Sequence, residues 1–273
     1  MRTFPGPPNY QFKPLTHQFD DGFGIIADAF NEAALRLERF SEQERFINSS
    51  LPIAYLYRHA IELYLKSIVI VLHRNLQIPF GPNPAIGAPL IRIDEKWIPI
   101  NRVHNVAALH RHFEDIMAKH VNQLQTTTRT DWNSILTELA DWLTAIENFD
   151  RQSTFFRYPG MGDALKGDFK ESSIADIWSR MGPDDPPSKA FIEFSANDEV
   201  VGAFRMEISQ LEPIKEILRK AATELSAIHF ACRCELAGGM DGANTKNTSL
   251  ILRVKRTRLN GCAQLPLLFG LMT

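Results

Sequence analysis

The sequence predicts a mainly α-helical protein: a helical bundle that carries small β-hairpin insertions. Apolar residues recur every three or four positions over several long segments, which is the spacing of helices with one buried face. The stretch 51–72 is apolar almost all round, which is typical of a helix at the centre of a bundle. Two stretches, near 90–100 and 190–208, alternate apolar and polar residues around turn residues, which favours hairpins.

The chain of 273 residues is long enough for one large domain or two small ones. Its 30 basic and 32 acidic residues nearly cancel, which excludes charge-driven, non-specific nucleic-acid binding by the chain as a whole but not by a local patch. The N-terminus lacks the apolar core of a signal peptide, and charges interrupt 51–72 too often for a typical transmembrane helix. Three cysteines are too few for a disulfide framework, so we expect a cytoplasmic protein without a membrane span.

Prolines and glycines divide the chain into three parts. We expect an irregular lead-in over 1–20, a helical domain over 21–237 and a weakly ordered, partner-seeking tail over 238–273. The helices of the domain are expected over 25–40, 49–72, 104–121, 131–146 and 211–236. The segment 150–186 is rich in turn residues and is expected to form loops.

Charged residues interrupt the second helix, which is otherwise apolar. Arg58, Glu62 and Lys66 are spaced by four and share one stripe, with His59 beside them. A charge on a mostly buried helix must pair, hydrate or line a cavity, because a lone buried charge is too costly. Two interpretations stay open: a half-exposed structural ladder of ion pairs, or the wall of a polar cleft.

Three histidines lie close together near the start of the third helix. The positive end of the helix dipole favours a neutral imidazole at His104. His110 and His112 are two positions apart, so they cannot share a helix face and lack the spacing of a helical zinc motif. The pair Cys232 and Cys234 lacks the second pair that a zinc site needs. We therefore prefer surface histidines to a metalloenzyme site and expect neither a metal nor a cofactor.

A third polar element lies between two aromatic residues and a proline. Arg157 and Tyr158 follow Phe155 and Phe156 and precede Pro159, which favours an extended segment. The Arg157 guanidinium can form a forked pair with a carboxylate such as that of Glu62. The alternative is a loop packed by its aromatic side chains, with Arg157 as a structural bridge.

These three segments, taken in order, resemble the HEPN superfamily of helical-bundle proteins. They are Arg58–Lys66, which reads RHAIELYLK, then His104–Val106 at a helix start, then the FRYP run Phe156–Pro159. The resemblance extends over about residues 20–235 and is to bacterial HEPN-like proteins with an RHxxELxLK helix and an FRYP element. It implies an up-and-down helical bundle that often forms a homodimer.

The resemblance also implies a link to RNA. Many HEPN proteins are metal-independent ribonucleases of bacterial defence or toxin–antitoxin systems, and their activity goes with an R-x(4–6)-H motif. No arginine of this chain has a histidine at that spacing, so the chain departs from the ribonuclease pattern. HEPN-like proteins without the motif are regarded as modules that bind RNA, a nucleotide or a partner protein.

Two hypotheses follow. In the first, the polar residues line a site for RNA or a nucleotide, with a histidine as general base and an arginine at the phosphate. Its catalytic candidates are Arg58, His59 and His104, and its ligand-binding candidates are Glu62, Lys66, Arg157 and Tyr158. In the second, the same residues form a structural network in a non-catalytic interaction or scaffold protein that binds a second copy or a cognate partner.

Overall fold

The computed structural model describes residues 14–44, 49–82, 87–132, 139–150, 169–179, 190–206 and 211–237. These residues form a mainly helical protein with small antiparallel sheets, as predicted. The helices are α1 (Phe23–Glu44), α2 (Ser50–Asn75), α3 (Val106–Thr127), α4 (Leu139–Phe149), α5 (Ile174–Ser179) and α6 (Glu212–Leu236), with 3₁₀ turns η2 (Leu15–His17) and η4 (Ile100–Arg102). The strands are β1 (Leu90–Ile93), β2 (Lys96–Pro99), β3 (Phe169–Glu171), β4 (Ala190–Phe194) and β5 (Val200–Met206). In these ranges, no helix has both the length and the apolar character that crossing a bilayer requires.

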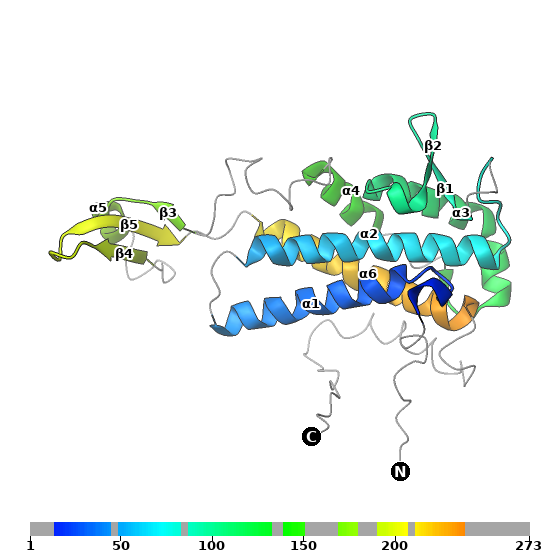
Figure 1. The fold of residues 1–273 in the computed structure, drawn as a ribbon, viewed down its shortest axis with the longest axis horizontal. Coiled ribbons are helices and arrows are strands. Elements are labelled where there is room, and N and C mark those ends of the chain that lie inside the picture. Colours follow the sequence, from blue (N-terminus) through cyan, green and yellow to red (C-terminus); the bar gives the residue numbers. More distant parts are fainter. Residues whose placement is uncertain are drawn as a thin grey trace, which may run out of the picture.

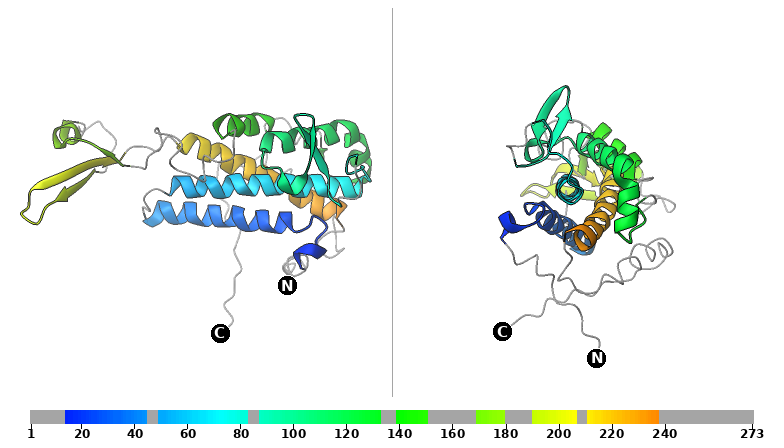
Figure 2. Two further views of the ribbon diagram at one scale, coloured as in Figure 1. Left: turned by 45° about the horizontal axis from the view of Figure 1, so that its top comes forward. Right: turned by 90° about the vertical axis from the view of Figure 1, so that its right-hand side faces the viewer.

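Helix α2 is the axis of the bundle. Seen end-on, it lies at the centre, with α1 and α6 on one side and α3 and α4 on the other (Figure 2). Every residue from Ala60 to His73 is buried. Each fully buried Val, Leu or Ile side chain stabilises the fold by roughly 1.5–3 kcal/mol before entropy costs are counted. The prediction of a central helix over 49–72 is confirmed.

The other predicted helices are present with shifted ends. α1 and α3 extend several residues beyond the predicted 25–40 and 104–121. Helix α3 begins at Val106 because Asn105 caps it: the Asn105 side chain accepts a hydrogen bond of 2.7 Å from the Ala108 backbone N–H. The predicted start of α4 near Asp131 falls partly on 133–138, outside the described residues.

The hairpin predicted near 90–100 is confirmed as β1 and β2. The two strands are antiparallel with Ile93 opposite Lys96, so Asp94 and Glu95 form a two-residue turn. Both turn residues have positive φ, 44° and 65°, as the twist of such a hairpin requires. Ile91 of β1 is buried against the bundle core, which anchors the hairpin there.

A second, three-stranded sheet lies with α5 at one end of the molecule (Figure 1). Its order is β3-β5-β4, all antiparallel, and the turn between β4 and β5 contains Asp198 with a φ of 58°. The prediction of a hairpin over 190–208 is confirmed. The prediction of loops over 150–186 is wrong where β3 and α5 form, because both are too short to show a period and β3 depends on pairing with β5.

The start of α1 is tied to two distant helices by the buried carboxylate of Asp20. This carboxylate accepts hydrogen bonds from the backbone N–H groups of Gly22, at 3.2 Å, and Gly24, at 2.9 Å. It also accepts one from Ser67 Oγ of α2, at 2.5 Å, and one from Arg233 Nη1 of α6, at 3.2 Å. The last residues of the segment predicted as an irregular lead-in therefore help to organise the bundle.

Candidate polar site around Glu62

The charged stripe of α2 is built around Glu62. Its Oε1 atom accepts hydrogen bonds from Lys66 Nζ, at 2.8 Å, and from His104 Nδ1, at 3.0 Å. Its Oε2 atom lies 3.4 Å from Arg58 Nη1. Arg58 and Lys66 lie one helical turn before and after Glu62, so the spacing of four brings both cations to one carboxylate, as the sequence predicted.

The stripe is buried rather than half exposed. Arg58, Glu62 and Lys66 are 4%, 1% and 2% exposed. The predicted ladder of ion pairs is present, but its predicted half exposure is wrong, because the chain before α3 covers the stripe and supplies backbone acceptors. Arg58 Nη2 donates to the carbonyl of His104 at 2.9 Å, and Lys66 Nζ lies 3.5 Å from the carbonyl of Asn101.

The buried charges balance. Asp150, directly after α4, is 3% exposed, and its Oδ2 lies 3.7 Å from Arg58 Nε. Two carboxylates therefore face two cations in the interior, which is the condition under which buried charges are tolerated. Burial alone would raise the pKa of Glu62, but the charges and hydrogen bonds of Lys66 and Arg58 lower this pKa below its ordinary value. Glu62 is therefore ionised at neutral pH.

His104 is the member of this cluster that reaches the surface. Its side chain is 54% exposed, whereas that of Glu62 is 2% exposed. Because the ionised Glu62 can only accept, Nδ1 of His104 carries the proton in this hydrogen bond. In the neutral ring the lone pair is then on Nε2. A buried carboxylate thus fixes the tautomer and the orientation of a surface imidazole.

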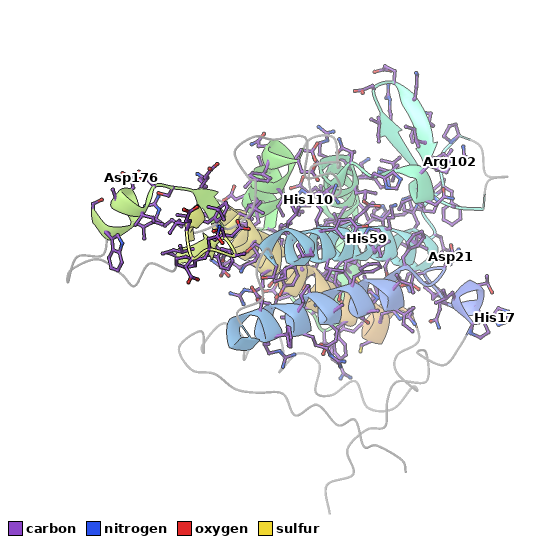
Figure 3. The ribbon with its side chains drawn as sticks, turned by 60° about the vertical axis from the view of Figure 1, so that its left-hand side comes forward. His17, Asp21, His59, Arg102, His110 and Asp176 are labelled. Carbon is purple, nitrogen blue, oxygen red and sulfur yellow. The ribbon has the colours of Figure 1, made fainter. Side chains whose placement is uncertain are left out.

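His59 does not join this cluster. It lies on α2 (Figure 3), and its ring meets that of Phe30 of α1 edge-on, with 4.4 Å between the ring centroids. Its ring also lies parallel to that of Tyr55, 5.9 Å away. One residue along a helix is a rotation of about 100°, so the neighbour of Arg58 in sequence faces another helix. The structure therefore separates His59 from the other catalytic candidates.

Two further predicted site residues, Arg157 and Tyr158, lie outside the described residues. The predicted fork between Arg157 and Glu62 accordingly stays a prediction.

Sequence analysis did not identify three residues that complete the site. Asp150 pairs with Arg58, Asn105 caps α3, and Glu147 of α4 accepts a hydrogen bond of 3.1 Å from Asn105 Nδ2. Burial raises the pKa of Glu147, although the charge of Arg58 opposes this rise. A signal existed for Asn105, since an Asn directly before an apolar periodic segment is a common helix start. No local signal marked Asp150, because its partner is remote in sequence.

Of the other two histidines of the predicted cluster, His110 is buried and His112 is partly buried. Nδ1 of His110 lies 3.5 Å from Glu114 Oε2 one turn later. His112 contacts His73 of α2, with 2.9 Å between their Nε2 atoms. The prediction of surface histidines is wrong for His110, which is buried, whereas His112 keeps partial exposure and His104 is exposed.

No metal site is formed by the described part of the chain: nowhere in it do three or more His, Cys, Asp or Glu side chains gather around a common point. Cys232 is buried in α6, and burial raises the pKa of its thiol. The hydrogen bond from His104 to Glu62 suits the chemistry of an oriented imidazole next to a buried charge: proton transfer or hydrogen bonding at His104. Comparisons of the chain with family models, with curated proteins and with solved structures found no match.

Proposed function

We propose that this chain is a HEPN-like protein with an RNA- or nucleotide-linked role, in which His104 is the group that meets the ligand. The observation that carries the proposal is the hydrogen bond of 3.0 Å from the surface imidazole of His104 to the buried carboxylate of Glu62. A carboxylate that orients a histidine and stabilises its protonated form is a recurring arrangement in acid–base catalysis.

On RNA, this arrangement suits removal of the proton from a 2′-hydroxyl. Nε2 of His104 accepts that proton, the 2′-oxygen attacks the adjacent phosphorus, and the bond to the 5′-oxygen breaks while the leaving oxygen takes a proton from solvent water. The products are a 2′,3′-cyclic phosphate and a 5′-hydroxyl. Without cleavage, the same imidazole donates to or accepts from a base, a ribose or a phosphate.

The structure changes the role we give to Arg58. Its guanidinium is buried among Glu62, Asp150 and the carbonyl of His104, so it is poorly placed to hold a phosphate directly. We assign it as a positioning residue that holds Glu62 and the chain at His104. A setting in bacterial defence and a homodimer follow from the HEPN resemblance, and a cytoplasmic location follows from the low cysteine count; all three belong to the same proposal.

The near-complete burial of Arg58, Glu62 and Lys66 favours a second candidate function. Arg58 and Lys66 each bind Glu62 and a nearby backbone carbonyl, so the network is also suited to holding α2 against α3 and α4 without any ligand. In that case the chain is a non-catalytic interaction or scaffold protein.

The test compares the full chain with the variants His104→Ala and His120→Ala. His120 of α3 is a partly exposed histidine whose Nδ1 lies 3.4 Å from Gln123 Oε1, and it is the matched control. Each protein is incubated with total RNA in EDTA, and binding of a labelled RNA and of nucleotides is measured by fluorescence anisotropy.

Loss of cleavage or binding in His104→Ala, with His120→Ala unchanged, supports the RNA-linked proposal. Equal behaviour of all three proteins in every assay contradicts it and favours the scaffold function. Because His104 is half exposed, we expect its substitution to leave the melting temperature nearly unchanged, so a loss of activity is not a loss of fold.

A further inference from the structure

His73 and His112 join the end of α2 to α3 through their imidazole rings. Their Nε2 atoms are 2.9 Å apart, the ring centroids are 5.2 Å apart, and the ring planes differ by 12°. The centroid separation is about the N–N distance plus one ring radius at each end. The two nitrogens therefore point at each other along the line of centres, which is the geometry of an N–H···N hydrogen bond.

The surroundings fix which ring donates. Nδ1 of His73 lies 3.2 Å from the carbonyl oxygen of Ile78, which can only accept, so His73 carries its proton on Nδ1. Nε2 of His73 is then the acceptor, and His112 donates from its Nε2. One proton is shared between the two Nε2 atoms, and this requires His73 to be neutral.

Charged groups of α3 change how readily the two imidazoles take up a proton. The charges of Lys119 and His120 disfavour protonation of His112 and His73, respectively, whereas the charge of Asp115 favours protonation of His112. From the chain after α2, the ring of Phe80 lies 5.8 Å from that of His73. Burial lowers the pKa of His73, and burial together with the neighbouring imidazole lowers the pKa of His112 to about 4.

We infer that the His73–His112 contact is an acid-sensitive clasp between the end of α2 and α3. In the neutral pair, Nδ1 of His112 is the nitrogen that can take a proton without losing the shared bond. A proton on Nε2 of His73 places two N–H groups face to face and breaks the bond. In that state Nδ1–H of His73 still donates to the carbonyl of Ile78, so only the link between α2 and α3 opens.

The direction of the pH effect follows from the lowered pKa values. Histidines in an unfolded chain have pKa values near 6.5, whereas those of the folded pair are lower. Below pH 6.5 the unfolded chain therefore binds more protons than the folded chain does. The contribution of the His73–His112 pair to the free energy of unfolding is fully present above about pH 6.5 and is lost as the pH falls toward about 4.

Two measurements on the full chain test the clasp. Nitrogen-15 NMR of the imidazoles in the unmodified protein should find His73 as the Nδ1–H tautomer and His112 as the Nε2–H tautomer, both titrating below 6.5. The urea midpoint is measured from about pH 7 to about pH 5 for the unmodified chain, His112→Gln and His17→Gln. Glutamine at 112 still donates but does not titrate, and His17 is an exposed histidine of η2 that serves as the control.

The midpoint should fall with acid in the unmodified chain and in His17→Gln, and should fall clearly less in His112→Gln. Parallel loss in all three proteins overturns the clasp. The opposite tautomer at His73, or ordinary titration near 6.5 for both rings, also overturns it, and the NMR result decides if His112→Gln does not fold.

Discussion

Asp20 and Arg233 meet inside the bundle, with 3.2 Å between Oδ1 and Nη1, although 213 positions separate them in the sequence. The contact joins the first and the last helix of the bundle, because Asp20 lies just before α1 and Arg233 lies in the last turn of α6. The second guanidinium nitrogen donates to Gln18 Oε1 at 3.0 Å.

Removal of the Asp20 charge should be strongly destabilising. Asp20→Asn leaves the buried Arg233 without its counter-charge, for which we expect a loss of about 3–5 kcal/mol in the free energy of unfolding. The neighbouring Asp21 is a matched control, since its ion pair with Arg74 at 3.0 Å is partly exposed and Asp21→Asn should cost less than about 1 kcal/mol. Urea denaturation of both variants is the measurement, and equal losses would contradict the assignment.

The same carboxylate should make stability depend on acid. Burial favours the neutral form of Asp20, but the adjacent His229 imidazole, the hydrogen bond from Ser67 and the charge of Arg233 lower its pKa well below the ordinary value of 3.8. A lowered carboxyl pKa contributes stability above the unfolded value, and this contribution is lost as the pH falls below about 3.8. The difference in unfolding free energy between the unmodified chain and Asp20→Asn should therefore shrink on acidification. A difference that grows in acid would show that the sign is wrong.

Glu62 offers a separate test of the buried network. Glu62→Ala leaves Arg58 and Lys66 facing each other without their shared partner, and we expect a loss of about 3–5 kcal/mol. Glu114→Ala is the control, because Glu114 is 43% exposed and pairs weakly with His110. Thermal and urea unfolding measure both. A Glu62→Ala protein as stable as the control would mean that the cluster is open to water and serves a ligand instead.

Gly24 is required by the close approach of α6 to α1. A Cβ atom at this position would lie 2.0 Å from Nε2 of His229 and 2.5 Å from Oδ2 of Asp20. Alanine normally stabilises a helix relative to glycine by about 1 kcal/mol, but the overlap should reverse this to a loss of about 1–3 kcal/mol. In a double-mutant cycle with His229→Ala, the combined loss should be smaller than the sum. Additive losses would exclude the contact as the cause.

The long helices could be predicted because their apolar spacing is a local property. The 3.6-residue period of α1, α3 and α6 and the continuous apolar run of α2 are visible without any partner. Both hairpins were also predictable from alternation around turn residues. The strand β3 was not, since three residues show no period and its pairing with β5 is remote in sequence.

The sequence predicts which residues of α2 form the candidate site, but not how far those residues are buried. The spacing of four grouped Arg58, Glu62 and Lys66 correctly, because it is a geometric property of one helix. Their burial depends on the chain before α3 and on Asp150, which come from other parts of the sequence. The turn of His59 toward α1 likewise depends on which helix lies on which side of α2.

The burial of every residue of α2 from Ala60 to His73 limits which substitutions this segment can accept in evolution. A helix with one outward face accepts substitutions there freely, but between Ala60 and His73 no residue faces solvent. A change of volume at any of these positions alters contacts with a neighbouring helix, so compensating changes must occur in pairs. Related chains should therefore diverge slowly along this segment and faster along the outward faces of α1, α3 and α6.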